Sequence, residues 1–241
     1  MKKILLLLLL ATGKISVAQD IVPGDKSIQT KWIKDENYKV KWYMIKDTVK
    51  QEVGIINTSV SVKNGKIYIV QNVNMKLATI PWVDSTIAGA NNIVPVYHSS
   101  YNAQRNMALN YRGNTISGYY RNNKSMEFNT ITDTVNSLYF DSNIYNYLLC
   151  WLPLKAGYTA KIPVYDYNSK DKHGVVYITI NNVTEAKYKF DDNTEENVFV
   201  LDVADGITGS NTIYYISTKT RQQLKMTSSF GPNKIEIVRV M

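Results

Sequence analysis

The chain has 241 residues, with 28 Lys and Arg against 20 Asp and Glu, a formal net charge of +8 at pH 7, and a single cysteine. One cysteine excludes an internal disulfide, and basic residues that are spread singly exclude a nucleic-acid footprint. The positive excess favours anionic partners such as phospholipid or lipopolysaccharide headgroups, although a soluble surface with some positive charge is the simpler interpretation.

Residues 1–18 have the order of a signal peptide. Lys2 and Lys3 precede the apolar run Ile4 to Ala11, and Ser16-Val17-Ala18 places small residues before a cut. The apolar run is much shorter than the roughly 20 residues that cross a bilayer. The sequence therefore predicts a signal peptide at 1–18 and one β-rich domain at 19–241, with no membrane-spanning segment. We expect export, most simply to the periplasm, with the outer-membrane periphery or secretion as alternatives.

Alternating apolar and polar residues predict a succession of strands. Tyr38 to Trp42 is the first such run, and two further runs flank Asn64-Gly65, a pair favoured in type I′ hairpins because both residues take positive φ. Asn181-Asn182 is expected to end a strand, and residues 187–197 to form an exposed hairpin end. The pattern is that of an antiparallel meander. Its later predicted strands are 94–101, 107–111, 116–120, 175–180, 199–203, 213–216, 224–230 and 235–240.

One short helix is predicted apart from the strands. Asp141 or Ser142 can cap its start, and Pro153 ends it because proline lacks an amide donor. So apolar a helix must be covered, and the natural place is the concave face of the sheet. The predicted fold is a mainly β protein, a curved antiparallel meander sheet or half-open barrel packed around this helix. The apolar residues that share one broad face of it are Ile144, Tyr145, Leu148, Leu149, Trp151 and Leu152.

Residue patterns for catalysis or metal binding are missing. His98 and His173 lie far apart, and neither has a metal-ligand or catalytic spacing. We expect His98 to be a satisfied, partly buried side chain and His173 to be solvated. Cys150 lies near the end of the helix, where the dipole raises a thiol pKa, so we expect it to be buried and inert. The sequence predicts no catalytic residue, no metal site and no cofactor.

Two groups of acidic residues can be considered as a calcium site and as a catalytic carboxylate pair, and the sequence supports neither function. The acids between 191 and 196 lack the spacing and glycine of a calcium loop. Asp202 and Asp205 are near one another, but the carboxylate pairs of glycoside hydrolases usually come from separate strands. A third pattern, Asp-Ser/Thr-apolar, resembles acceptor sites of O-glycosylation in some Gram-negative envelopes. It occurs at Asp47-Thr48-Val49, Asp84-Ser85-Thr86 and Asp133-Thr134-Val135.

Three blocks in the centre of the chain carry a resemblance to a known family. Residues 141–145 enter the helix, Leu152-Pro153-Leu154-Lys155-Ala156-Gly157 forms a "Leu-Pro-Leu-x-x-Gly" turn, and Pro163-Val164-Tyr165-Asp166 forms a "Pro-Val-x-Asp" strand. In this order they resemble a family of exported bacterial proteins, the domain-of-unknown-function 3108 family. The composition, rich in Asn and Tyr, is similar to that of Bacteroidota proteins. The family has no assigned activity, so the resemblance implies no catalytic residues. It implies a fold similar to the LolA/LolB lipoprotein carriers, a curved sheet wrapped round a helix.

Three hypotheses about function follow. The leading one is a periplasmic, non-enzymatic binding or carrier protein for an amphipathic or lipid-like ligand. The second is a module that binds an envelope protein by pairing at a sheet edge. The third is an unrecognised glycan or peptide hydrolase that uses an acid such as Asp202. For the carrier hypothesis, the candidate ligand-lining residues are Trp42, Tyr147, Leu148 and Trp151.

Overall fold

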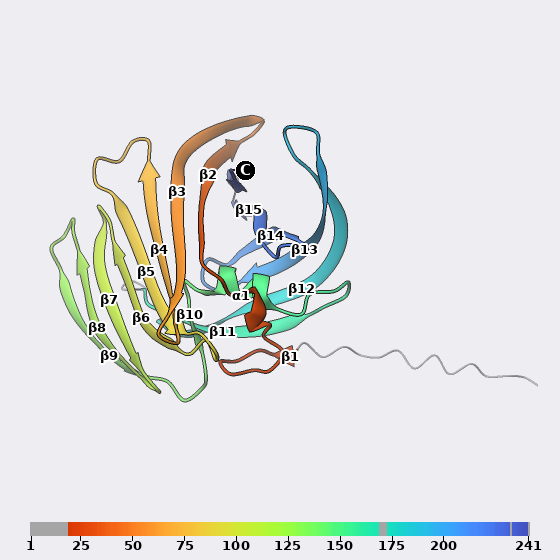
Figure 1. The fold of residues 1–241 in the computed structure, drawn as a ribbon. Coiled ribbons are helices and arrows are strands. Elements are labelled where there is room, and N and C mark those ends of the chain that lie inside the picture. The colour runs from red at the N-terminus through yellow and green to blue at the C-terminus, as the bar shows by residue number, and fades with distance from the viewer. Residues whose placement is uncertain (1–18, 169–172, 232, 241) are drawn as a thin grey trace, which may run out of the picture.

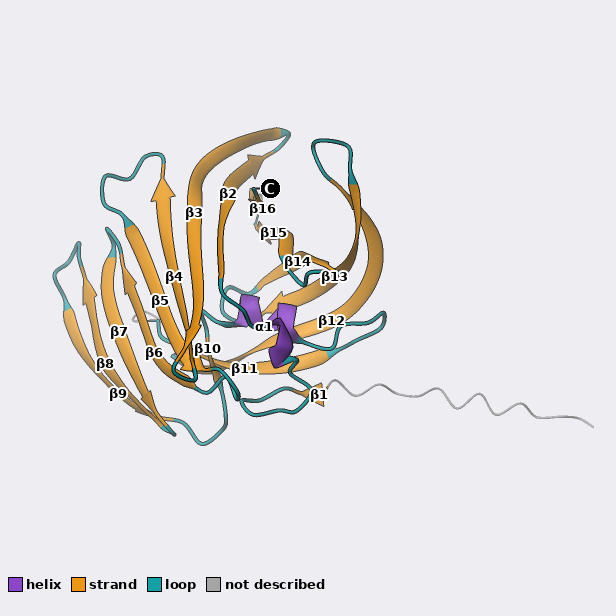
Figure 2. Ribbon diagram, in the orientation of Figure 1, coloured by secondary structure: helices purple, strands orange, loops and turns teal. Residues whose placement is uncertain are grey.

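The chain forms one large, open, strongly curved β-sheet with a short helix against its concave face (Figures 1 and 2). The computed structural model describes residues 19–168, 173–231 and 233–240, so the predicted signal peptide lies outside the described residues. Within these ranges the structure has sixteen strands, the 3-10 turn η1 (Thr30–Trp32) and the helix α1 (Tyr145–Trp151).

The sheet consists of two antiparallel meanders that are joined edge to edge, because β16 pairs with β2. Two very short strands, β1 (Gln19–Asp20) and β10 (Phe140–Asp141), pair in parallel with β11. The first meander contains β2 (Glu36–Lys46), β3 (Val49–Lys63), β4 (Lys66–Met75), β5 (Trp82–Gly89), β6 (Pro95–Tyr101), β7 (Arg105–Arg112), β8 (Thr115–Asn122) and β9 (Phe128–Thr134). The second contains β11 (Ala160–Asp166), β12 (Gly174–Lys189), β13 (Glu195–Asp205), β14 (Ser210–Ser217), β15 (Gln223–Phe230) and β16 (Asn233–Arg239).

The predicted meander is confirmed, but some strands end at other residues than predicted. Asn64 and Gly65 take φ values of 51° and 70° in the β3–β4 turn, as the hairpin prediction requires. The prediction that Asn181-Asn182 ends a strand is wrong. A bulge between Ile180 and Asn182 absorbs the irregularity, and β12 continues to Lys189. The exposed hairpin end that was expected at 187–197 is the turn between β12 and β13.

The helix is present where it was predicted, and it is buried on most of its surface. Leu148 and Leu149 are fully buried in the main core, and Leu152 becomes extended before Pro153. The predicted cap is wrong, because Ile144 occupies the cap position and no side chain caps the helix. The Asp141 carboxylate binds other side chains instead. The core that α1 shares with the sheet includes Val60, Ile67, Ile69, Ile178, Ile180, Leu201 and Val203.

The two ends of the sheet meet through side chains rather than through strand pairing. Tyr111 of β7 packs edge-on against Tyr165 of β11, with 6.1 Å between ring centroids. The Tyr165 hydroxyl donates a hydrogen bond of 3.0 Å to Asp133 of β9. These contacts belong to a second apolar cluster, separate from the helix core. The sheet is therefore held in its curved shape without closing on itself.

Candidate functional site

Cross-strand rows of side chains organise the concave face of the first meander. Opposite residues in paired strands point to the same face of a sheet, so the strand register defines each row. One row joins Glu36, Val60, Ile69 and Thr86, and its two central residues, Val60 and Ile69, pack in the core that contains the helix. The next row is polar and joins Tyr38, Thr58, Gln71 and Asp84. On β3 and β4 the face therefore changes from apolar, at Val60 and Ile69, to polar, at Thr58 and Gln71.

Beyond the polar row the concave face becomes apolar again. One row joins Val40, Ile56, Val73 and Trp82, and the row after it joins Trp42, Gly54 and Met75. Val40, Ile56 and Val73 are buried beneath Trp42, Met75 and Trp82, which are themselves partly exposed. The Trp42 and Trp82 rings lie 6.3 Å apart. We call the surface formed by Val40, Trp42, Ile56, Val73, Met75 and Trp82 the concave groove.

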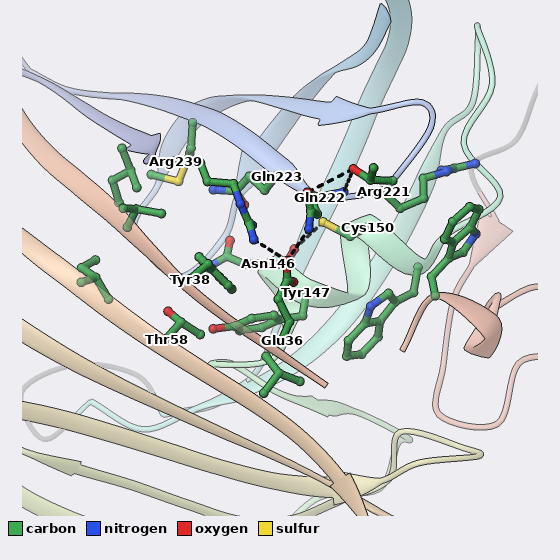
Figure 3. A pocket seen from close by; sticks show the side chains of 18 of the residues that line it. Glu36, Tyr38, Thr58, Asn146, Tyr147, Cys150, Arg221, Gln222, Gln223 and Arg239 are labelled. Atoms are coloured by element: carbon green, nitrogen blue, oxygen red, sulfur yellow. Dashed lines mark hydrogen bonds and ion pairs between the residues drawn. The ribbon is translucent and has the colours of Figure 1, made fainter. Parts of the chain in front are cut away.

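Two cavities lie at the ends of the concave groove. The first, of about 100 Å³, lies between α1 and strands β2, β3, β15 and β16 (Figure 3). The second, of about 490 Å³, is bounded by Trp42, Met75, Trp82 and the β4–β5 connection at Ala78 and Ile80. Val40 and Ile56 line the first cavity and pack in the same cluster as Trp42 and Trp82 of the second. The row that joins Val40, Ile56, Val73 and Trp82 therefore borders both cavities on one face.

The structure separates the four residues that the sequence nominated for a ligand. Tyr147 lines the first cavity from the helix (Figure 3). Trp151, whose ring lies 6.4 Å from that of Tyr147, lines it as well. Trp42 lines the second cavity from β2. Leu148 is fully buried on the core side of the helix and lines neither. Three of the four thus share the concave face, and their role in ligand binding stays a prediction.

The first cavity contains buried polar atoms without a hydrogen bond of good geometry, although the hydroxyls of Thr58 and Tyr147 lie close to that of Tyr38. These are Thr58 Oγ1, Tyr147 Oη and Arg221 Nε. Burial, and after it the neighbouring Tyr38, raises the pKa of Tyr147 well above its ordinary value, so this phenol stays neutral. Buried polar groups normally have a partner, because leaving one unpaired costs about 1–3 kcal/mol. The cavity wall is therefore polar but incompletely satisfied.

A buried polar network lies at the entrance to the helix. Asp141 Oδ1 is 2.7 Å from His98 Nδ1 and accepts a hydrogen bond of 2.9 Å from the Tyr111 hydroxyl. Asp141 Oδ2 accepts from Thr86 Oγ1 at 2.9 Å, and Thr86 Oγ1 accepts from Asn143 Nδ2 at 2.9 Å. The network ties the segment before α1 to β5, β6 and β7. The expectation that His98 is a satisfied, buried histidine is confirmed.

Opposing effects set the pKa of His98. Burial acts to lower it, but the charge of Asp141 and the hydrogen bond to it raise the pKa above the ordinary histidine value. The protonated imidazole is thus favoured inside the fold. The Asp141 carboxylate already interacts with His98, Tyr111 and Thr86. The network therefore serves to hold the segment before the helix in place.

The other chemical candidates are dispersed. Asp205 is buried, accepts a hydrogen bond of 2.8 Å from Tyr145, and binds the amides of Ile207 and Thr208. Asp202 lies three residues earlier on the opposite face of β13, so the two carboxylates do not form a pair. Burial raises the pKa of Cys150 to about 12, as expected of an inert thiol. Over the described ranges, no group of three metal-ligating side chains comes together.

The remaining sequence motifs lie on the surface or near it. His173 and the acidic turn between β12 and β13 are exposed, as expected. Thr48 and Thr134 of the acceptor-like motifs are exposed, whereas Ser85 is half-buried within β5. No helix in the described part of the chain is long and apolar enough to cross a membrane.

The fold and the site place the protein among curved, open antiparallel sheets that have one covering helix and a groove on the concave face. The family described as "Protein of unknown function (DUF3108)" matches residues 37–238, which include the groove and all of the first meander except Glu36. The chain belongs to this family. A search of the curated proteins found no match.

Proposed function

We propose that the protein is an exported, non-enzymatic binding or carrier protein that holds an amphipathic, lipid-like ligand in the concave groove. The observation that carries this proposal is the order of the rows on the concave face. A polar row, in which the buried Thr58 Oγ1 is unpaired, lies beside two apolar rows whose outer side chains Trp42, Met75 and Trp82 are partly exposed. An amphipathic molecule has the complementary arrangement of polar and apolar parts.

The size and chemistry of the groove support a small ligand. The second cavity, of about 490 Å³, lies in the range of about 300–1,000 Å³ that is typical of ligand sites. Its apolar wall includes Ile80, which is 56% exposed, in addition to the two tryptophans. Covering such surface yields about 25 cal/mol for each Å² removed from water. An alkyl chain in the groove would therefore stabilise the complex.

Location in the envelope is part of the proposal and is supported by the sequence pattern of residues 1–18. A carrier there would meet lipids and other amphiphiles at the surfaces of the membranes. The test of location is fractionation of cells that express the full chain. A mature protein that starts at Gln19 and releases with the periplasm fits the proposal, whereas a full-length cytoplasmic protein contradicts it.

Binding is tested with a neutral fluorescent amphiphile, N-phenyl-1-naphthylamine, titrated into the mature protein. The groove variant Met75→Glu places a carboxylate in the apolar wall and is expected to weaken binding about tenfold or more, because a charge resists desolvation. Val49→Glu makes the same chemical change at a residue that is 67% exposed and outside the groove, and is expected to leave binding unchanged. Equal affinity in all three proteins would contradict a groove site.

A second function, assembly with an envelope protein, is favoured by one observation. The strand β9 ends the pairing order of the sheet, so it has a free edge, and its Phe128 is 60% exposed. Free edges can pair with a strand of another chain. A partner that co-purifies at fixed stoichiometry, and is lost in Phe128→Glu but kept in Met75→Glu, would support assembly over ligand binding.

A further inference from the structure

Arg221, in the turn between β14 and β15, is a half-buried cation without a counter-charge. It lines the first cavity (Figure 3), and across the residues that the structure describes no carboxylate lies within ion-pair distance of it. Arg239, which lines the same cavity, is instead paired with Glu36. Half-buried charges are costly unless a partner compensates them.

The guanidinium of Arg221 is held in place by neutral groups. Its Nη1 donates to the carbonyl oxygen of Leu152 at 3.1 Å, and its centre lies 4.7 Å from the Phe199 ring and 5.6 Å from the Trp32 ring. Its Nε is buried and has no hydrogen-bond partner. The backbone of Arg221 has a φ of 59°, a conformation that L-residues rarely adopt. The side chain is thus fixed, with part of its donor set unused.

The cavity as a whole carries excess positive charge. Its charged lining residues are Lys34, Arg221 and Arg239 against Glu36, which gives 3 − 1 = +2. Glu36 already accepts hydrogen bonds from Gln222 and Arg239. Burial lowers the pKa of Arg221, which accords with a guanidinium that lacks a nearby carboxylate. Nothing in the lining of the cavity neutralises Arg221.

We propose that Arg221 binds the anionic head group, a carboxylate or a phosphate, of a single-chain amphiphile whose alkyl chain lies in the concave groove. This inference rests on the proposed function and specifies its ligand. A planar guanidinium suits both head groups, because its donors match two oxygen atoms at once. Val40 and Ile56 line the same cavity and lead to Trp82 across β2, β3, β4 and β5. Three interstrand spacings span about 14 Å, so a twelve-carbon chain is a suitable probe.

The test compares ligands that share a chain and differ in charge. Isothermal titration calorimetry of the mature protein measures binding of dodecanoate, dodecyl phosphate and dodecanol, with acetate and inorganic phosphate as anions without a chain. We expect the wild type to bind both anionic amphiphiles about ten- to a hundredfold more tightly than dodecanol, the effect of one charge-assisted interaction. Acetate and inorganic phosphate should bind much more weakly than either anionic amphiphile.

The variants assign that preference to Arg221. Arg221→Gln should reduce the ratio of the dodecanol and dodecanoate dissociation constants to about one, whereas Arg221→Lys should keep part of it. Arg112→Gln makes the identical substitution at an exposed residue of β7 and should keep the full ratio. Melting temperatures verify that each variant is folded. If Arg221→Gln does not fold, the wild-type ratio and Arg221→Lys decide the matter.

Each contrary result has a distinct meaning. Binding of all three amphiphiles with equal affinity, or an unchanged ratio in Arg221→Gln, would overturn the head-group assignment and leave the carrier proposal standing. Binding of inorganic phosphate as tight as that of dodecyl phosphate would show a free-anion site and overturn the lipid assignment. No binding of any amphiphile would overturn the proposed function itself.

Discussion

Two regions of the concave face differ in what covers them. Near the helix, Val60 and Ile69 lie beneath α1 and belong to the closed main core. Farther along the same strands, Val40 and Ile56 are covered only by partly exposed side chains such as Trp42. In both regions the inward-facing apolar side chains are alternate residues of the same strands. A seven-residue helix therefore completes only part of the core, and the outer apolar side chains beyond it stay partly exposed.

The largest effect is expected when the anchor of the covered region is broken. Asp141→Asn removes the charge that His98, Tyr111 and Thr86 share in a fully buried site. We expect a loss of about 3–5 kcal/mol in the free energy of unfolding, measured by urea denaturation. Asp191→Asn, an exposed control in the β12–β13 turn, should change it by less than about 0.5 kcal/mol. Equal small effects would show that the network does not hold the helix segment.

The next effect concerns the packing of the helix itself. Leu148→Ala removes a fully buried side chain from the core and should cost about 2–5 kcal/mol, because it leaves a cavity. Leu77→Ala, at a residue that is 99% exposed, should be nearly neutral. A stability loss without a selective loss of probe affinity would assign Leu148 to the core rather than to the ligand site.

A smaller effect on stability, with a larger one on binding, is expected in the uncovered region. Trp42→Ala removes an aromatic side chain from the groove and should weaken N-phenyl-1-naphthylamine binding about tenfold. Tyr43→Ala changes the neighbouring aromatic, which points to the opposite face of β2, and should leave probe affinity unchanged. If both variants bind equally well, the two faces of β2 are not functionally distinct.

The smallest effect is a dependence of stability on pH in the covered region. The pKa of His98 is raised in the folded state above its ordinary value of about 6.5, so protonation favours the fold. This stabilisation is fully present below about pH 6.5 and is lost as the pH rises through the folded-state pKa. Urea denaturation between pH 5 and pH 9 should show the decline in the wild type and not in His98→Asn. An identical slope in both would refute the role of His98.

Local patterns predicted much of the fold. The Asn64-Gly65 hairpin, the helix and its end at Pro153 follow from turn chemistry, helical spacing and the properties of proline. Strand β5 was not predicted, because its inward positions Asp84 and Thr86 are polar and break the apolar alternation. Thr86 faces inward to bind Asp141 and Asn143 from elsewhere in the chain, and Asp84 accepts a hydrogen bond from Trp82 of the same strand. A local sequence pattern cannot predict such contacts between distant segments.

The site was less predictable than the fold, because it depends on strand pairings between distant segments. Trp42, Tyr147 and Trp151 could be nominated as large aromatic residues, but only the register places them on one face. Arg221 could not be predicted as a site residue from the sequence, since a basic residue in a polar turn normally lies in solvent. The pairing of β16 with β2 brings the two meanders together and creates the cavity beside it.

Native mass spectrometry of the mature protein, purified without detergent from its own cells, shows whether the concave groove carries a ligand. Ligand binding in the groove predicts extra mass that disappears on denaturation, partitions into organic solvent, and is reduced in Met75→Glu but not in Val49→Glu. A wild-type protein that carries only its polypeptide mass, and that takes up no added amphiphile, would contradict it.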